Sequence, residues 1–213
     1  MHVQYIPRTM KLLLQSFIAL CAVSTAFSLN IVIAGGTGKV GKLLSSTLHN
    51  QKKGHEIKIL CRNAFLASTP ARVSGDFGWL GESFLNKHTS VELRDWDGGD
   101  LLDIVGCDWQ GWQEDVLPKA DIVVNLVGGY TEQRTMACER LVRETYRLNP
   151  RVKHVILSMA DIDLKTTLKK NRAKQCEDML TANCADVVCL RAEMFDVKGA
   201  NDQILNIIDG MEK

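Results

Sequence analysis

Short runs of β-branched and aliphatic residues recur along the chain, and stretches with a helical spacing of apolar residues separate most of them. The apolar runs occupy residues 31–34, 57–61, 91–94, 122–127, 154–158 and 187–191. Their nearly continuous apolar character is typical of strands that helices cover on both faces. The helical patterns are clearest at 41–51, 131–148 and 164–182,. This alternation predicts an α/β fold, a Rossmann-type doubly wound parallel sheet in a single domain.

The first 26 residues differ from the rest of the chain. Arg8 and Lys11 precede an apolar stretch, and the small residue Ala26 stands where a signal peptidase would cut. A charged start, an apolar centre and a small-residue cut are the marks of a secretory signal peptide. We therefore expect 1–26 to be a removable presequence that takes the protein into the secretory pathway, and 29–213 to be the folded domain.

Three alternatives to this interpretation of the start remain open. Residues 23–27 resemble the cleavage site of plastid presequences in diatoms and related algae, where a phenylalanine such as Phe27 follows the cut. Against it, the first strand begins near Asn30 and leaves no room for a transit peptide. Met10 could also start the chain, or the apolar stretch could stay as an uncleaved anchor, although it is short for a membrane span. After cleavage we expect no stable membrane span.

Composition narrows the function further. The chain has 213 residues, 46% of them hydrophobic and 24% charged, with 26 Lys and Arg against 25 Asp and Glu. A net charge of +1 gives no field that favours nucleic acid,. Seven cysteines occur without metal-ligand spacing,. We therefore expect no metal site, and free thiols rather than disulfides, with Cys61 and Cys189 in strands that look buried.

A glycine-rich turn follows the first predicted strand directly and leads into an amphipathic helix. The turn reads Gly35, Gly36, Thr37, Gly38, Lys39, Val40 and Gly41. Glycines at 35, 38 and 41 permit a tight turn, let backbone N–H groups approach a pyrophosphate, and let the helix pack close to the sheet. The anion then lies at the positive end of the helix dipole. Of these residues, Gly35, Thr37, Gly38, Lys39, Val40 and Gly41 are the predicted phosphate-binding part of a dinucleotide site.

Arg62 bears on which dinucleotide binds. It stands about twenty residues after Gly41 at the end of the second predicted strand, where NAD sites usually hold an acidic residue on the ribose hydroxyls,. A guanidinium there can pair with a 2′-phosphate through two parallel hydrogen bonds. The position favours NADP(H) over NAD(H), although Arg62 could also be an ordinary solvated residue after a strand.

The spacing of Gly35, Gly38 and Gly41 resembles the atypical and extended short-chain dehydrogenase/reductase superfamily, especially its NmrA-like and sugar-nucleotide-epimerase-like branches. The resemblance covers roughly residues 30–195. Residues 91–97 are similar to the third strand and the acidic residues after it that contact adenine in the family. This implies adenine contacts for Asp95 and Asp97, and the Trp96-Asp97 pair matches one epimerase-like branch.

Two further segments carry the resemblance. Residues 120–129 are similar to the fourth strand and the loop beside the ribose and nicotinamide, which implies cofactor contacts for Leu126, Val127 and Gly128. Residues 152–158 are similar to the fifth strand, which ends in a serine that often faces the substrate. Ser158 is the matching residue, although a serine at a strand end is as often a helix cap.

The catalytic pattern of the family is incomplete. Active members place a tyrosine and, four residues later, a lysine on the helix after the fifth strand, where the lysine lowers the pKa of the phenol. No Tyr-x-x-x-Lys occurs in this chain. Lys174 matches the lysine, but Lys170 stands where the tyrosine belongs. The resemblance implies that Lys174 holds the nicotinamide ribose; a solvated helix face is the alternative.

The sequence thus leaves two functions open. One is an NADP(H)-dependent oxidoreductase or epimerase-like enzyme acting on an unknown small molecule, with Ser158 and Lys174 as candidate catalytic residues. The other is a non-catalytic NmrA-like dinucleotide-binding redox sensor or assembly factor. For the tryptophans at 79, 109 and 112 we expect packing against the sheet rather than ligand stacking. We expect 65–90 to be a loop-rich connection with one short helix.

Overall fold

The computed structural model describes residues 28–69, 80–96, 111–127, 131–158, 167–191 and 196–212. Six parallel strands form one sheet in the order β3-β2-β1-β4-β5-β6. The strands are β1 (Asn30–Ala34), β2 (Glu56–Cys61), β3 (Val91–Asp95), β4 (Ile122–Asn125), β5 (Lys153–Ser158) and β6 (Asp186–Arg191). All six predicted strands are present, and the predicted α/β doubly wound architecture is confirmed.

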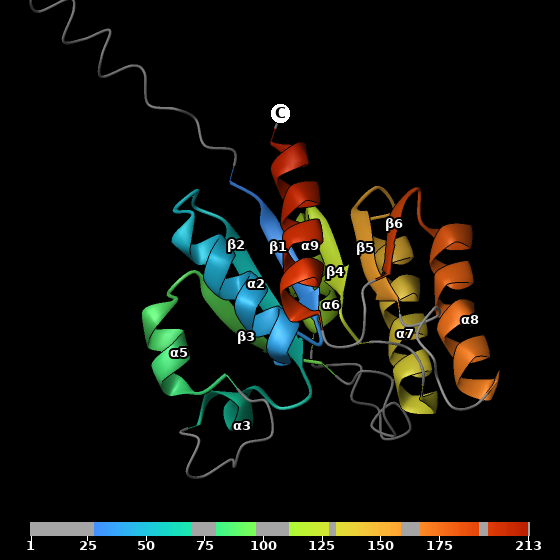
Figure 1. Ribbon diagram of the computed structural model, residues 1–213, viewed down its shortest axis with the longest axis horizontal. Coiled ribbons are helices and arrows are strands. Elements are labelled where there is room, and N and C mark those ends of the chain that lie inside the picture. The colour runs from blue at the N-terminus through green and yellow to red at the C-terminus, as the bar shows by residue number, and fades with distance from the viewer. Residues whose placement is uncertain are drawn as a thin grey trace, which may run out of the picture.

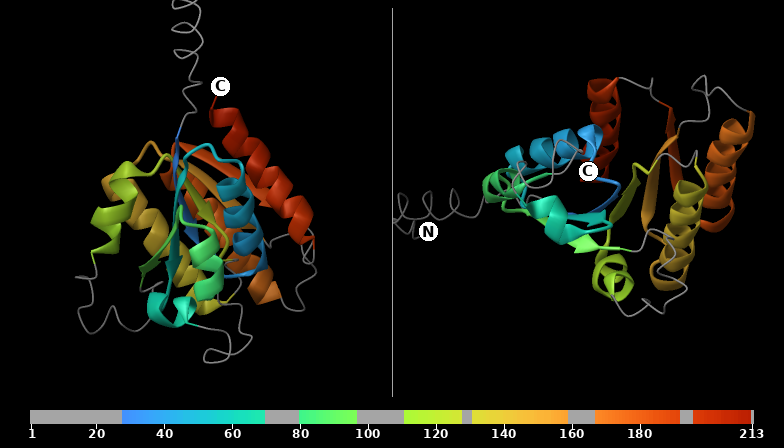
Figure 2. Two further views of the ribbon diagram at one scale, coloured as in Figure 1. Left: turned by 90° about the vertical axis from the view of Figure 1, so that its left-hand side faces the viewer. Right: turned by 90° about the horizontal axis from the view of Figure 1, so that it is seen from below.

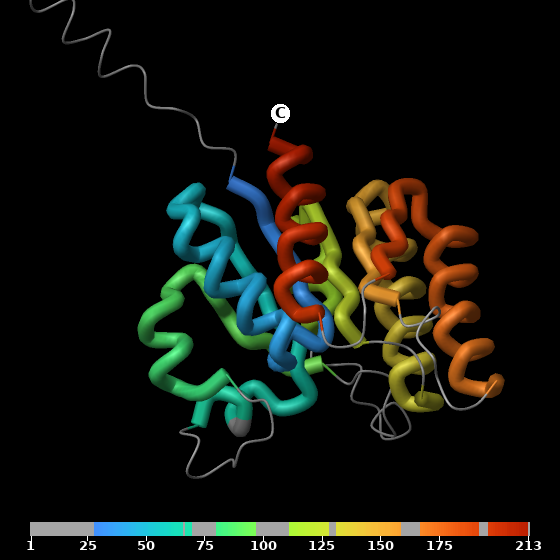
Figure 3. Tube along the Cα trace, viewed as in Figure 1, coloured from blue at the N-terminus to red at the C-terminus, as the bar shows by residue number. Residues whose placement is uncertain are grey.

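Helices cover both faces of the sheet (Figures 1 and 2). On one face lie α2 (Lys39–Asn50), α5 (Glu82–Lys87) and α9 (Val197–Met211). On the other lie α6 (Trp112–Val116), the 3-10 turn η3 (Leu117–Lys119), α7 (Glu132–Leu148) and α8 (Thr167–Asn183). The last helix, α9, packs along α2, although the two are far apart in sequence (Figure 3).

Alternation along the strands gives each face its own core. In β1, Ile31 and Ile33 join the core under α2 and α9, while Val32 and Ala34 join the core under α6 and α7. All four side chains are at most 1% exposed. A strand buried on both sides has no polar face, which is why its sequence reads as a continuous apolar run.

Several boundaries differ from the sequence predictions. The fourth strand ends at Asn125 rather than 127, because the side chain of Asn125 accepts a hydrogen bond from the Val127 backbone N–H and turns the chain. The described part of 65–90 contains two short helices, α3 (Ala64–Ser68) and α5, rather than one. The predicted presequence lies outside the described residues. No helix among the described residues is long and apolar enough to cross a membrane.

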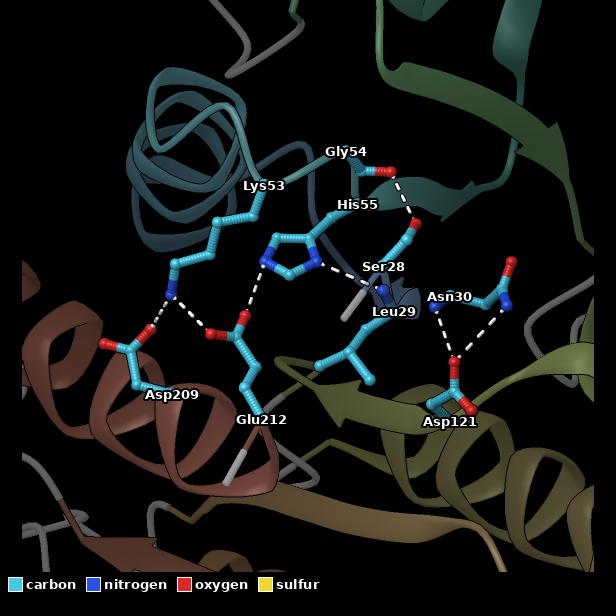
Figure 4. Close-up of polar contacts among 9 residues, drawn as sticks. All are labelled: Ser28, Leu29, Asn30, Lys53, Gly54, His55, Asp121, Asp209 and Glu212. Carbon is cyan, nitrogen blue, oxygen red and sulfur yellow. Dashed lines mark hydrogen bonds and ion pairs between the residues drawn. The ribbon is translucent and has the colours of Figure 1, made fainter. Parts of the chain in front are cut away.

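Polar contacts tie together the amino-terminal ends of the strands (Figure 4). The Ser28 hydroxyl donates to the Gly54 carbonyl at 2.6 Å, and the Leu29 N–H donates to His55 Nδ1 at 3.2 Å. The Asn30 N–H donates to the Asp121 carboxylate at 2.7 Å. These bonds hold the chain where it enters β1, directly after the predicted presequence.

The last helix, α9, and the residue after it contact the same amino-terminal ends of the strands. His55 Nε2 lies 3.1 Å from Glu212 Oε1, and Lys53 Nζ lies 2.7 Å from Glu212 Oε2 and 2.6 Å from Asp209 Oδ1 (Figure 4). His55 is only 3% exposed. Burial lowers its pKa, more than Glu212 raises it. A neutral ring with its proton on Nε2 fits both contacts, since Nδ1 must accept from Leu29,.

Candidate functional site

The glycine turn lies at the centre of the sheet, where β1 ends between β2 and β4. Gly35 has a φ of +75°, which favours glycine,. A Cβ on Gly35 would also lie 3.2 Å from the Leu126 carbonyl carbon. The Gly35 N–H donates to Leu60 O of β2 at 3.4 Å, and just before the turn Ala34 O of β1 accepts from the Leu126 N–H, directly after β4, at 2.9 Å.

The turn and helix α2 touch backbone to backbone. A Cβ on Gly41 would lie 2.2 Å from the Gly36 carbonyl oxygen, so no other residue fits there without moving the helix. A Cβ on Gly36 would lie 2.9 Å from methyl groups of Ile33 and Ile59. Sequence reasoning on the three spaced glycines gave Gly36 no role; the adjacent glycine pair was the signal for it.

The amino terminus of α2 is open to an anion. Gly38 is the residue before the helix, and no side chain within the described residues caps it or places a carboxylate in its first turn. The first backbone bond of the helix runs from the Lys42 N–H to Gly38 O. The amides of Lys39, Val40 and Gly41 therefore have no acceptor inside the helix. With Lys39 exposed beside them, they present positive charge at this helix end.

Gly38 differs from its neighbours. The atom nearest to a Cβ placed there would be Gly35 O at 3.7 Å, an ordinary contact. Packing therefore does not require glycine at 38. Thr37, between the two tight positions and this open one, is half-buried. The turn is thus tight at 35, 36 and 41, where it meets the sheet and the helix, and open at 38.

Arg62 lies next to the turn. Ala34 pairs with Leu60, so the residue after β2 lies close to the end of β1. The Arg62 side chain is exposed. The next strand supports this corner, since Asp95 Oδ1 accepts a 2.6 Å hydrogen bond from the Ala64 N–H. Cys61 is buried beneath it, and burial together with the Asp95 charge raises the pKa of its thiol to about 12.

Trp96 follows β3 and turns into the core. Its side chain is 4% exposed and contacts Trp112 edge-to-face with ring centroids 5.6 Å apart. The backbone N–H of Trp96 donates to the Cys61 carbonyl oxygen at 3.0 Å. Trp112 is 2% exposed, so the packing expected for it is confirmed. Asp97 and the tryptophans at 79 and 109 lie outside the described residues.

Asn125 organises the end of β4. It is 1% exposed, its Oδ1 accepts from the Val127 N–H at 3.0 Å, and its Nδ2 donates to the Cys138 thiol on α7 at 3.4 Å. Leu126 and Val127 are half-buried beside the glycine turn. Gly128 lies outside the described residues. Sequence reasoning passed over Asn125, although a lone amide inside an apolar run was its signal.

Ser158 and Lys174 occupy different environments. Ser158 is 3% exposed at the end of β5 and pairs in register with Arg191 on β6. Across from Arg191, the inward-facing Glu177 of α8 accepts from its guanidinium at 2.8 Å. Lys174 is exposed and lines a shallow outer hollow of about 470 Å³ with Asn171, Gln175 and Asp178.

The two cysteines expected in strands also differ. Cys61 is buried, as expected, but Cys189 is only half-buried. The reason is that β6 is the last strand of the sheet and has a neighbour on one side only. Cys61, Cys138, Cys176, Cys184 and Cys189 are all free thiols.

Comparisons with known proteins place the fold. No family model and no curated protein matches the sequence. Similar solved structures include an oxidoreductase of the short-chain dehydrogenase/reductase family from Aeromonas hydrophila, with 14% identity and a TM-score of 0.53 over 83% of this chain and 89% of that one. The chain has the short-chain dehydrogenase/reductase fold.

Two further structures extend the comparison. NmrA, a negative transcriptional regulator solved with NADP, has 11% identity and a TM-score of 0.52 over 77% of this chain and 45% of its own. An NADPH-dependent quinone oxidoreductase from Escherichia coli, solved with NADPH, has 18% identity and a TM-score of 0.50 over 76% and 48%. This chain thus spans about half the length of these two. The resemblance drawn from the glycine spacing is confirmed as a likeness of fold.

Proposed function

We propose that the protein binds a nicotinamide dinucleotide, with its pyrophosphate at the amino terminus of α2. One observation carries the proposal: a helix end without a side-chain cap or first-turn acid follows a tight glycine turn at the end of β1. The strand order reverses between β1 and β4, and ligands of doubly wound sheets bind in the crevice at this switch point,. The NADP of NmrA and the NADPH of the quinone oxidoreductase support the ligand class.

The test uses Gly38, the one glycine of the turn with space for a side chain. Gly38→Asp adds a carboxylate that can cap α2 but repels phosphate, whereas Gly38→Asn adds a neutral cap of the same size. Calorimetric titration should show that Gly38→Asp binds NADPH roughly tenfold more weakly than Gly38→Asn, or weaker still. A tenfold difference corresponds to about 1.4 kcal/mol. Equal affinities of the two variants, or no binding by the unchanged protein, would remove the proposal.

We propose NADP(H) rather than NAD(H) as the preferred form. Arg62 supports this, since it is exposed directly after β2 and beside the turn. A fork of N–H groups there suits a 2′-phosphate. Asp95 is engaged with the backbone of Ala64, so in this proposal it shapes the adenine side of the site by fixing the segment after Arg62.

For the chemistry we propose an atypical reductase without a tyrosine acid. Ser158 and Arg191 meet at the carboxyl ends of β5 and β6, where a small substrate with a carbonyl or hydroxyl group could bind. Lys174 holds the nicotinamide ribose in this proposal, which requires its long side chain to reach over the end of α8. Steady oxidation of NADPH by quinone or carbonyl compounds, slowed by Ser158→Ala, would support it.

A dinucleotide sensor without catalysis is the second candidate. The missing Tyr-x-x-x-Lys and the exposed position of Lys174 favour it. NADPH binding without any oxidation across a panel of acceptors is the result that distinguishes it from a reductase. The N-terminal pattern further supports entry into the secretory pathway, which a fluorescent fusion of residues 1–26 in the native host would test.

A further inference from the structure

A half-exposed guanidinium lies against a buried carboxylate at the carboxyl end of β6. Arg191, the last residue of that strand, donates from Nη2 to Glu177 Oε2 on α8 at 2.8 Å. The Arg191 side chain is 49% exposed, whereas that of Glu177 is 9% exposed. A carboxylate buried this deeply needs a charged or hydrogen-bonding partner. The ion pair therefore holds the guanidinium from the inside, while half of the Arg191 side chain remains open to solvent.

Ser158 lies beside Arg191. The two residues pair in register at the ends of β5 and β6, on strands about 4.8 Å apart, so their side chains share one face of the sheet,. That face is the one under α7 and α8, because Ile156 and Cys189, two residues earlier in the same strands, pack there. A hydroxyl and a guanidinium thus stand at neighbouring strand ends, and both are hydrogen-bond donors.

A similar ion pair at the other end of the sheet shows what is particular to Arg191. Arg147 lies in the last turn of α7, which returns to the amino-terminal ends of the strands. Its side chain is 51% exposed and pairs with Glu144, whose side chain is 10% exposed. A second carboxylate, that of Glu114, also lies 2.7 Å from Arg147. Ligands of parallel α/β sheets bind at the carboxyl ends of the strands, so of the two arginines Arg191 is the one placed to meet a ligand.

The missing tyrosine indicates what this guanidinium can do. Reduction of a carbonyl group puts negative charge on its oxygen, and no Tyr-x-x-x-Lys is present to supply a proton there,. A guanidinium keeps its proton, so Arg191 cannot replace the tyrosine as an acid. It can instead stabilise the charge through a charge-assisted hydrogen bond. Water would then supply the proton.

We propose that Arg191 and Ser158 bind a ligand oxygen that carries negative charge, such as a phenolate or enolate oxygen or the oxygen of a carbonyl group during its reduction. Glu177 fixes the direction of the guanidinium and reduces its net charge. The catalytic meaning of this site rests on the proposed function, because it requires a reductase. The binding of an oxyanion does not.

The binding is tested with 4-nitrophenol and without any dinucleotide. The purified full chain is titrated with this probe at several pH values, and the absorbance of the phenolate is followed. We expect the protein to bind the phenolate about tenfold more tightly than the phenol, which lowers the pKa of the bound probe by about one unit. Arg191→Gln should remove the preference, and Arg147→Gln should keep it. Absence of binding, or a preference that is absent from the start or survives in Arg191→Gln, overturns the proposal.

Two further variants separate charge from folding. Arg191→Gln leaves the buried charge of Glu177 without its cation, so the double variant Arg191→Gln with Glu177→Gln is measured beside it, since it holds no unpaired charge. It should also show no preference. Glu177→Gln alone keeps a hydrogen-bond acceptor for Arg191 and removes a competing negative charge, so the phenolate preference should rise about twofold or more. A preference that does not rise contradicts the role given to Glu177.

The catalytic role is read separately, with NADPH and carbonyl compounds. We expect Arg191→Gln to lower kcat about 10²- to 10³-fold, the usual loss when one oxyanion donor is removed, with NADPH affinity unchanged in calorimetry. An unchanged kcat overturns the catalytic role. Bound NADPH that the unchanged protein never oxidises refutes the proposed reductase and this role with it. The phenolate titration still decides whether the oxyanion site exists, so the two failures are distinguishable.

Discussion

The amino-terminal and carboxyl-terminal ends of the parallel strands form two edges of the sheet, and these two edges are built in opposite ways. At the amino-terminal edge, polar groups pair with one another: His55 lies between the Leu29 N–H and Glu212, and Lys53 bridges two carboxylates (Figure 4). At the carboxyl-terminal edge, the first amides of α2 have no side-chain cap among the described residues. Groups paired within the protein contribute to stability, whereas groups presented outward can contribute to binding.

Parallel topology explains why the edges can differ. All strands point the same way, so every strand-to-helix connection of the sheet falls at the carboxyl edge and every return at the amino edge. At the amino edge, the connection from α2 to β2 also contacts Ser28, just before β1, and the end of the last helix, α9. We therefore expect substitutions at the carboxyl edge to change ligand binding and those at the amino edge to change stability alone.

Gly41→Ala gives the largest expected effect. Its Cβ would lie 2.2 Å from the Gly36 carbonyl, so α2 must move away from the turn. Overpacking of this kind costs about 1–3 kcal/mol or more, and NADPH binding should be lost along with the turn geometry. Gly210→Ala on α9 is the matched control, since nothing lies within 4 Å of its Cβ. Denaturant unfolding should show it stabilised by roughly 0.5–1 kcal/mol. Normal NADPH affinity in Gly41→Ala would contradict this account of the turn.

Acid should destabilise the protein through His154, a buried ring on β5 near the amino edge. Its side chain is 0% exposed, neither nitrogen has a hydrogen-bond partner among the described residues, and burial lowers its pKa to about 4. Between the unfolded value of 6.5 and about 4, the unfolded chain binds the proton that the folded chain does not. Stability is therefore full above pH 6.5 and declines as the pH falls toward 4, by up to about 3 kcal/mol.

The matched variant for this prediction is His154→Leu, which removes the titrating ring and keeps an apolar side chain in its place. Chemical denaturation from pH 7 to pH 4 should show a smaller loss of stability for the variant than for the unchanged protein. The pKa of His55 is also lowered, so the variant keeps some decline of the same sign. Identical pH profiles would mean that His154 gains a proton partner in solution.

Arg62→Ala should weaken NADPH binding far more than NADH binding. A charge-assisted pair with a 2′-phosphate contributes roughly 1.5–3 kcal/mol, so NADPH affinity should fall about ten- to a hundredfold. NADH affinity should change little, because NADH lacks that phosphate. Calorimetry with both cofactors measures the difference. Equal affinity of the unchanged protein for NADPH and NADH would exclude the assigned role.

Sequence patterns predicted the parts of the molecule that local rules determine. Continuous apolar runs located all six strands, and the spaced glycines located the turn, because backbone geometry and double-sided burial each leave a direct mark on residue type. The contact of the Asn125 amide with the Cys138 thiol depends on how α7 packs against the sheet. Such long-range packing leaves no periodic signal, so these residues emerged only from the structure.

Glu212→Gln gives the smallest expected effect and completes the comparison. Glu212 is 17% exposed at its side chain and meets both Lys53 and the buried ring of His55, so an amide there weakens the ion pair while keeping a hydrogen-bond acceptor for His55. We expect a loss of about 1 kcal/mol in unfolding free energy, at the upper end for partly exposed pairs. Asp209→Asn, at a 42% exposed carboxylate that meets only Lys53 among the described contacts, should lose less. NADPH affinity should be unchanged in both. A change of affinity in Glu212→Gln would show that the amino edge reaches the binding site through α9 and α2, and that the division between the two edges is wrong.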